Sequence, residues 1–237
     1  MKKAIALVDN ILKPALQWVT GEDDWLNIFL SLYKKVGKYW ESKTLIIIGP
    51  TASGKDSFLD KLRKKEIKQD YSQTRGSEEV EKYKLEWTID GKTITTNAAP
   101  SINVGGEIDQ RERFWKEACK PCDVIFYLID AEKLKTDRDA LLSRLRGDLK
   151  WLVVNASTFK KDFKLSLIVN KIDLVVQEDE DQNENIIAEL INEVKEIAEK
   201  TLSVRKNHLV GVFPLSITNE YMFETYSAKI LTETMEA

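Results

Sequence analysis

Apolar residues recur along the chain in two alternating patterns, and each pattern predicts a different kind of element. After residue 43, short apolar runs that favour buried strands alternate with stripes at the three- and four-residue spacing of amphipathic helices. We expect strands at about 44–48, 80–90, 92–104, 123–130, 165–169 and 209–215, and helices at about 55–66, 108–119, 141–152, 187–197 and 219–233. This alternation predicts an α/β fold with a largely parallel sheet.

Two of the strands are expected to form a hairpin. Residues 80–90 and 92–104 flank Asp90-Gly91, a dipeptide favoured in two-residue hairpin turns, so they should pair antiparallel. Residues 123–130 are apolar at nearly every position, which is typical of a strand buried on both faces. We therefore place that strand at the centre of the sheet.

The first 42 residues follow the helical pattern alone. Apolar positions from Ile5 to Val19, with Pro14 as a kink or a boundary, and from Leu26 to Trp40 form two amphipathic stripes. We divide the chain into an N-terminal helical extension, residues 1–42, and an α/β domain, residues 43–237. The stripes favour packing on the domain or on a partner, and the alternative is peripheral contact with a membrane surface.

Composition and charge narrow the class of protein. The 237 residues are 43% hydrophobic, which is enough for a folded core. The chain has 36 Lys and Arg residues and 39 Asp and Glu residues, so no overall positive charge favours nucleic acid as a partner. No apolar run approaches the roughly 18–20 residues that span a bilayer, and the apolar run after Lys3 is too short for a signal peptide. We expect a cytoplasmic protein.

The two cysteines form a single Cys-Lys-Pro-Cys, Cys119 to Cys122. The motif is expected to close a helix, where the helix dipole disfavours a thiolate. With His208 the only histidine, few soft ligands are available for a zinc site. We therefore expect free thiols.

A glycine-containing loop carries the clearest chemistry. Gly49, four further residues, Gly54 and Lys55 follow a predicted strand and precede a predicted helix, which is the context of a phosphate-binding loop. Backbone N–H groups, the helix N-terminus and the Lys55 ammonium would together bind the β- and γ-phosphates. The candidate phosphate-binding residues are Gly49, Ala52, Ser53, Gly54, Lys55, Asp56 and Ser57. Asp56 replaces the usual Ser or Thr whose hydroxyl ligates Mg²⁺.

A second motif carries a family resemblance. Asn170-Lys171-Ile172-Asp173 follows the predicted strand 165–169 and resembles the Asn-Lys-x-Asp guanine-recognition motif of Ras-like GTPases. Asp173 would accept two hydrogen bonds from guanine, a pair that adenine cannot supply, and Lys171 would lie along the ring. The resemblance implies a P-loop NTPase three-layer sandwich, with a mostly parallel six-stranded sheet and one antiparallel strand. It also implies GTP or GDP as ligand, together with Mg²⁺.

A third segment resembles the Asp-x-Gly-Gly-Gln segment of Arf-type GTPases, with two departures. Asn103 stands where an acid holds Mg²⁺ through water, and Glu107 stands where a glutamine orients the attacking water. Gly106 keeps the backbone N–H that would meet a γ-phosphate. Thr74, with Arg75 beside it, resembles the switch threonine that closes on Mg²⁺, although its polar surroundings are equally typical of a solvated loop.

The guanine-sealing Ser-Ala-Lys of the family corresponds to Ser216-Ile217-Thr218, which would contact the base through its backbone. A literal Ser227-Ala228-Lys229 lies in the predicted final helix, and we do not assign it to the site. From the resemblance, the candidate catalytic residues are Lys55, Thr74, Gly106 and Glu107, the candidate metal ligands are Asp56, Thr74 and Asn103, and the candidate base-binding residues are Asn170, Lys171, Asp173, Ser216 and Ile217.

The residues that differ from the family motifs lead to two mechanistic hypotheses. Asp56 and Asn103 exchange the positions of an acid and a neutral oxygen ligand, so we expect Asp56 to ligate Mg²⁺ directly. Ionised Glu107 can only accept hydrogen bonds, which predicts slow hydrolysis unless it acts as a general base or Arg75 acts as an arginine finger in cis.

The sequence favours a slow GTP-hydrolysing switch that meets a protein effector through its switch regions or its N-terminal helices. The principal alternative is a catalytically inactive GTPase-like binding module or scaffold. The phosphate loop also resembles that of tRNA prenyltransferases, and a P-loop kinase is a further alternative. The prenyltransferase resemblance leaves the segment from Asn170 to Asp173 unexplained, and the sequence shows no arginine-rich lid segment of the kind a P-loop kinase has.

Overall fold

A computed structural model describes residues 38–63, 77–80, 83–89, 92–98, 101–176 and 180–237. Its centre is a six-stranded sheet in the order β2-β5-β1-β6-β7-β8. The strands are β1 (Leu45–Ile48), β2 (Ser77–Val80), β5 (Ser101–Val104), β6 (Val124–Asp130), β7 (Lys164–Asn170) and β8 (Leu209–Pro214). Strands β5, β1, β6, β7 and β8 run parallel, and β2 pairs antiparallel with β5.

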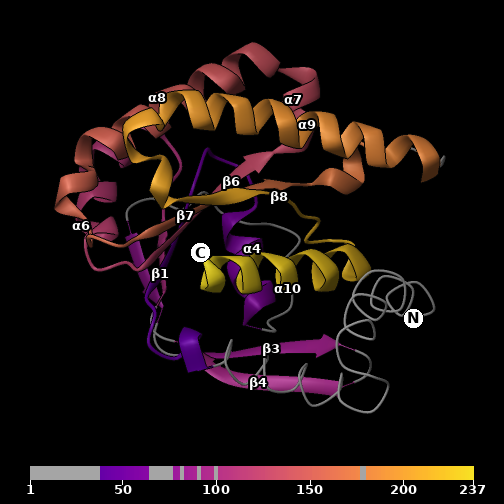
Figure 1. Cartoon of the computed structure of the whole chain (residues 1–237), viewed down its shortest axis with the longest axis horizontal. Coiled ribbons are helices and arrows are strands. Elements are labelled where there is room, and N and C mark those ends of the chain that lie inside the picture. Colours follow the sequence, from indigo (N-terminus) through magenta and orange to yellow (C-terminus); the bar gives the residue numbers. More distant parts are fainter. Residues whose placement is uncertain (1–37, 64–76, 81–82, 90–91, 99–100, 177–179) are drawn as a thin grey trace.

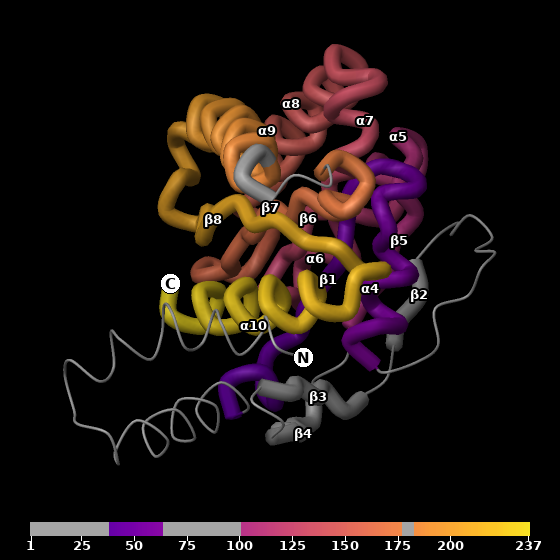
Figure 2. The backbone as a smooth tube through the Cα atoms, turned by 90° about the vertical axis from the view of Figure 1, so that its right-hand side faces the viewer, coloured from indigo at the N-terminus to yellow at the C-terminus, as the bar shows by residue number. Residues whose placement is uncertain are grey.

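Helices cover both faces of this sheet (Figure 1). Those longer than one turn are α4 (Lys55–Leu62), α7 (Ala131–Thr136), α8 (Arg138–Asn155), α9 (Glu180–Thr201) and α10 (Glu220–Glu236). Figures 1 and 2 place α7, α8 and α9 on one side of the sheet and α4 and α10 on the other. The expected three-layer α/β sandwich, with its one antiparallel strand, is confirmed.

The continuous apolar runs arise because both faces of the central strands are buried. In β1, Ile46 and Ile48 pack into the core under α8 and α9, whereas Leu45 and Ile47 pack into the core under α4 and α10. All seven residues of β6 are buried in the same alternating way. Successive side chains of a strand point to opposite faces, so a strand between two helical layers needs apolar residues at every position.

The predicted hairpin is divided differently. Strands β3 (Tyr83–Ile89) and β4 (Lys92–Ala98) pair antiparallel in a separate two-stranded sheet, and of the strands in this region only β2 and β5 belong to the main sheet. The expected strands 80–90 and 92–104 are therefore wrong as single elements. Pro100 lies between β4 and β5 in the sequence and has no backbone N–H to donate, so it cannot continue a ladder.

The predicted helix 108–119 exists, with an irregular middle turn. It consists of α5 (Ile108–Gln110), a π-helical turn η2 (Arg111–Trp115) and α6 (Lys116–Cys119). Cys119 and Cys122 are free and buried at its end, as expected. Burial raises the pKa of the Cys122 thiol to about 12, so it stays protonated at neutral pH.

The described chain begins with a helical turn, residues 38–40, that packs into the domain. The Trp40 side chain is 1% exposed and lies 6.0 Å from Phe126, ring centre to ring centre. Lys43 forms an ion pair with Asp123, whose carboxylate also accepts a hydrogen bond from the backbone of Thr44. The rest of the predicted N-terminal helices lies outside the described residues.

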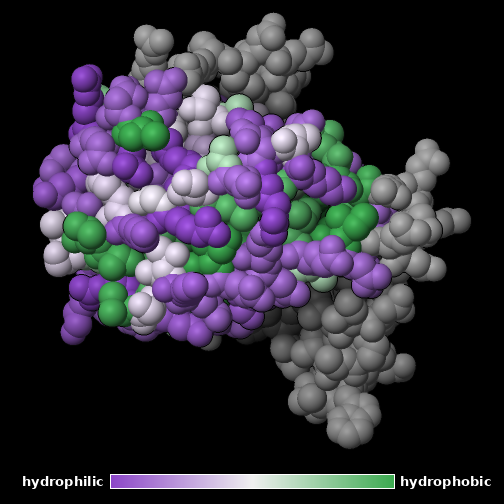
Figure 3. Space-filling model, turned by 90° about the horizontal axis from the view of Figure 1, so that it is seen from above, coloured by the Kyte–Doolittle hydropathy of each residue, from purple (hydrophilic) through white to green (hydrophobic). Residues whose placement is uncertain are grey.

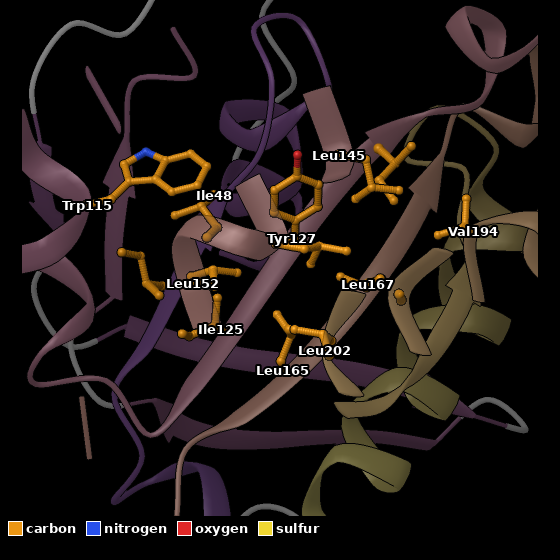
Figure 4. Packing of buried hydrophobic residues seen from close by; sticks show 14 of the residues in the cluster. Ile48, Trp115, Ile125, Tyr127, Leu145, Leu152, Leu165, Leu167, Val194 and Leu202 are labelled. Atoms are coloured by element: carbon orange, nitrogen blue, oxygen red, sulfur yellow. The ribbon is translucent and has the colours of Figure 1, made fainter. Parts of the chain in front are cut away.

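The outer surface over α7 to α9 is mainly hydrophilic, with hydrophobic residues visible between the polar ones (Figure 3). Beneath it, Trp115, Tyr127, Leu152 and Leu165 belong to one cluster of buried residues (Figure 4). Among the helices described, none is both long enough and apolar enough to cross a membrane.

Candidate functional site

The sequence-predicted site residues gather at one edge of the sheet. The segments that follow β1, β5, β6, β7 and β8 all leave the sheet at the carboxyl ends of parallel strands. In open α/β sheets this edge is where ligands bind. Thr74 and Arg75 lie outside the described residues.

The loop between β1 and α4 has a backbone that depends on glycine. Gly49 has φ +138° and Gly54 has φ +94°, values that side chains rarely tolerate. A Cβ atom at Gly49 would lie 2.3 Å from the Leu128 carbonyl oxygen. Ala52 also has a positive φ of 64°, an uncommon conformation for a residue other than glycine. The loop therefore adopts the tight turn that a phosphate cradle requires.

Lys55 opens α4 and turns back into this loop. Its Nζ donates to the carbonyl oxygens of Gly49 and Pro50 at 3.1 and 2.8 Å. Burial is the main cause that lowers the pKa of Lys55 to about 8. The Asp56 carboxylate opposes this shift, and the nearby cations Arg144 and Lys133 contribute to it. An anion at this point would restore the preference for the charged ammonium.

Asp56 and Asn103 lie together, although 47 residues separate them in the sequence. The amide Nδ2 of Asn103 donates to Oδ1 of Asp56. Asn103 is 1% exposed, and its Oδ1 atom has no hydrogen-bond partner among the residues that the structure describes. The acid and the neutral ligand that appear exchanged in the sequence thus share one location at the start of α4.

Asn170 joins the end of β7 to the phosphate loop. Its Nδ2 donates to the Ser53 carbonyl oxygen at 3.0 Å, and a Cβ atom at Gly54 would lie 2.4 Å from the same Nδ2. Lys171 has a left-handed backbone, φ 65°, and its Nζ lies 2.6 Å from Asp130 Oδ2. The Asn170 amide therefore fixes the spacing between the predicted base site and the predicted phosphate site.

Asp173 meets the segment after β8. Its Oδ2 accepts a hydrogen bond from the Thr218 hydroxyl at 2.9 Å, while its buried Oδ1 has no partner. Ser216 is fully buried, and its Oγ accepts a hydrogen bond from the Asn219 backbone N–H at 3.1 Å. Ile217 packs beside Gly54. Ser227 lies in α10, so the literal Ser-Ala-Lys is part of a helix, as expected.

Gly106 lies directly against the phosphate loop. A Cβ atom there would be 2.6 Å from both the Gly49 carbonyl oxygen and the Thr51 amide nitrogen. The next residue, Glu107, is exposed and forms the N-cap of α5. Only glycine permits this approach of the segment after β5 to the loop after β1.

The unpaired buried polar atoms concentrate in this region. In the described part of the chain, five buried side-chain N or O atoms have no hydrogen-bond partner. Four of them belong to the sequence-predicted site: Ser53 Oγ, Asn103 Oδ1, Asn170 Oδ1 and Asp173 Oδ1. Buried polar groups are normally paired, so this clustering indicates that the site is built to bind a polar ligand.

The donor set also fits Mg²⁺. No group of three or more His, Cys, Asp or Glu side chains that could hold a metal occurs among the residues described. Mg²⁺ bound with a nucleotide needs only one or two protein oxygens, because phosphates and waters fill the other positions. The Asp56 carboxylate and the unpaired Asn103 Oδ1 are oxygens of the required kind.

Three contributors to this region are absent from the sequence motifs. Asp130 ends β6, caps α7 through the backbone N–H groups of Glu132 and Lys133, and pairs with Lys171. Lys133 Nζ lies 3.5 Å from the Thr51 carbonyl oxygen. Arg144 Nη2 donates to the Gly106 carbonyl oxygen at 3.0 Å. An acid at the end of a buried strand was a usable signal for Asp130, whereas the sequence held no spacing signal for Arg144.

A glycine-dependent loop after β1, an Asn-Lys-x-Asp segment after β7 and a glycine pair after β5, on a mostly parallel sheet, are together the features of a small GTPase of the Ras-like class. The chain belongs to the Gtr1/RagA G protein family, whose conserved region matches residues 44–235. Membership makes it a GTP-binding G protein and confirms the Ras-like resemblance. No curated protein matched the chain.

Proposed function

We propose that this G protein is a slow GTP-hydrolysing switch that uses Mg²⁺. The observation that carries the proposal is the set of unpaired buried atoms at Ser53, Asn103, Asn170 and Asp173, which run from the phosphate site to the base site. A guanine nucleotide has complementary groups along that line: guanine N–H donors toward Asp173 and a metal-bound phosphate chain toward Asn103.

Each part of the site has a definite task in this proposal. Backbone amides of the phosphate loop and Lys55 bind the β- and γ-phosphates. Bound Mg²⁺ would neutralise phosphate charge, with Asp56 and Asn103 as its protein ligands and Thr74 as a third. Gly106 would offer its N–H to the third phosphate, and Glu107 would act on the attacking water.

Slow hydrolysis follows from the chemistry of Glu107. An ionised carboxylate accepts hydrogen bonds but cannot donate one to a phosphate oxygen, as a glutamine amide does. Partner binding through the switch regions or the N-terminal helices belongs to the same proposal.

Single-turnover hydrolysis of GTP with Mg²⁺ tests this function. We expect conversion to GDP and phosphate at a rate far below that of an activator-assisted enzyme, with Asp162→Asn, an exposed acid remote from the site, as the matched control. A Glu107→Gln variant that is slower than the wild type indicates that Glu107 is a general base. GTP binding without turnover would favour the alternative, a catalytically inactive binding module.

A further inference from the structure

Two consecutive carbonyl groups after β5 accept hydrogen bonds from side chains of other elements. The Trp115 indole Nε1 donates to the Gly105 carbonyl oxygen at 3.2 Å. Arg144 Nη2, from α8, donates to the Gly106 carbonyl oxygen at 3.0 Å. Both glycines are buried, and Trp115 has no exposed surface. Each of the two peptide planes is therefore held by one side-chain donor.

These bonds orient the amides on the opposite side of each plane. In a trans peptide the C=O group and the following N–H point in opposite directions, and no described peptide bond is cis. The bond from Trp115 to Gly105 therefore directs the Gly106 N–H away from Trp115. The bond from Arg144 to Gly106 directs the Glu107 N–H away from Arg144. The Gly106 amide is the group that the proposed function assigns to the third phosphate.

Arg144 is itself fixed by a buried carboxylate. Its Nε lies 2.7 Å from Asp148 Oδ2, one helical turn along α8. The Tyr127 hydroxyl donates to the same oxygen at 2.7 Å, and Arg111 Nη1 lies 2.8 Å from Asp148 Oδ1. Asp148 has no exposed surface. These partners leave Arg144 little rotational freedom, so its second bond, to Gly106, is held in place as well.

The packing around Trp115 gives the other donor the same rigidity. Its ring meets Tyr127 and Trp151 edge to face, with ring centres 6.4 and 5.8 Å apart. In Figure 4 the indole nitrogen of Trp115 and the hydroxyl oxygen of Tyr127 point to the same edge of the apolar cluster. Arg111 and Trp115 are the two ends of the π-helical turn η2, so this irregular turn supplies groups to both halves of the network.

We propose that Trp115 and Arg144 are positioning residues for the γ-phosphate-binding amide of Gly106. Trp115 fixes the peptide plane that contains this amide, and Arg144 fixes the next plane, so the Gly106 backbone is held on both sides. The inference rests on the proposed function, because it assigns an orientation to a group of that site. Neither residue belongs to a sequence motif of the family resemblance. A purely structural role for Arg144, as a partner of Asp148 and no more, is the outcome that the test must exclude.

The test compares affinities for GTPγS and GDP in the presence of Mg²⁺. GDP lacks the third phosphate, so a change in the Gly106 amide should affect GTPγS alone. We expect Arg144→Met to lower the affinity for GTPγS about tenfold, the size of one hydrogen bond to a charged group, and to change the affinity for GDP less than twofold. Arg146→Met, at an exposed arginine of the same helix, should change neither.

Two further variants separate positioning from stability. Trp115→Phe keeps an aromatic ring in the core but removes the indole donor, so it should show the same selective loss for GTPγS even if Arg144→Met folds poorly. Arg111→Met removes the other arginine from Asp148 but no bond to the glycine pair. It should lower thermal stability while the ratio of the two affinities stays unchanged.

Failure of the positioning role and failure of the proposed guanine-nucleotide binding give different results. Equal losses for both nucleotides in Arg144→Met and Trp115→Phe, or no loss in either variant, overturn the inference alone. A wild-type protein that binds neither GDP nor GTPγS overturns the proposed function and the inference together.

Discussion

The side chains of Asp56 and Asn103 carry the main chemical departure of this G protein. Their direct contact places a carboxylate where phosphate charge is expected, beside an amide oxygen that has no partner. A carboxylate within about 4–6 Å of a phosphate repels it unless a cation lies between them. The contact between Asp56 and Asn103 therefore predicts that nucleotide affinity depends on Mg²⁺.

We predict that GDP affinity depends steeply on Mg²⁺, falling at least about tenfold when the metal is chelated, since the Asp56 carboxylate then repels the phosphates. The double variant Asp56→Ser with Asn103→Asp should depend on Mg²⁺ less, because it returns the hydroxyl and the acid to the positions that they occupy in the family motifs. Fluorescent GDP displacement with and without a chelator measures both. Equal affinity of the wild type with and without Mg²⁺ would show that Asp56 does not ligate the ion.

Asp173 should determine the choice of base. Replacing it by Asn exchanges an acceptor for a donor, so Asp173→Asn should weaken GDP binding about 10- to 100-fold. Binding of xanthosine diphosphate should strengthen, because xanthine carries a carbonyl where guanine carries its amino group. Competition binding with both nucleotides checks this, and Asp162→Asn is the control. A variant that keeps full GDP affinity would place the base elsewhere.

Lys55 should give nucleotide binding a pH dependence of definite sign. Its pKa of about 8 rises when phosphate oxygens surround the ammonium, so binding takes up a proton above about pH 8 and affinity falls as the pH rises toward 10.5. Without nucleotide, the folded protein releases the Lys55 proton near pH 8, whereas the unfolded chain keeps it to about pH 10.5. Folding stability therefore rises with pH between these two values.

Calorimetry at about pH 9 in two buffers of different ionisation enthalpy measures this proton uptake. Lys55→Arg stays charged throughout the interval and should take up none. If the wild type and Lys55→Arg take up the same number of protons, another group is responsible.

At the scale of elements, the site depends on where strands end rather than on any one helix. Segments from β1, β5, β7 and β8 meet because parallel strands share their carboxyl edge, and Asn170 and Gly106 fix two of them against the phosphate loop. The helical turn before β1 contributes through packing. Trp40 fills the core under α4 and α10, beside Phe126 and Phe58.

We predict that Trp40→Ala lowers the free energy of unfolding by about 3–5 kcal/mol, the usual cost of deleting a large buried aromatic side chain. Val154→Ala, at a position 77% exposed on α8, should cost less than about 0.5 kcal/mol. Denaturant unfolding of both variants provides the comparison. A cost for Trp40→Ala as small as that of Val154→Ala would mean that this turn does not belong to the folded core.

Sequence reasoning succeeded where the physical constraint is local. The run 123–130 identified β6, because a strand between two helical layers must be apolar throughout. The tight turn from Gly49 to Gly54 was located because a turn with positive φ needs glycine at set positions. The hairpin boundaries were missed, since strand pairing across residues 80–104 depends on partners that no local pattern specifies.

The network of Asp148, Arg111, Arg144 and Tyr127 was missed for the same reason. Arg144 and Asp148 have the four-residue spacing of a helical ion pair, but the contacts of Asp148 with Arg111 and Tyr127 join residues 37 and 21 positions apart, and no spacing rule brings those together. One signal existed. Asp148 falls on the apolar stripe of α8 between Leu145 and Leu152, and an acid on a buried face requires charged partners.

At the scale of the whole molecule, the carboxyl edge of the sheet is where we propose that guanine nucleotide binds. Membership of the Gtr1/RagA G protein family over residues 44–235 and the unpaired buried atoms of the site support it independently. Isothermal titration of the nucleotide-free full chain with GDP and ADP, each with Mg²⁺, tests it most directly. We predict saturable binding of GDP and no measurable binding of ADP. Equal affinity for both nucleotides, or binding of neither, would contradict the assignment of this edge as a guanine-nucleotide site.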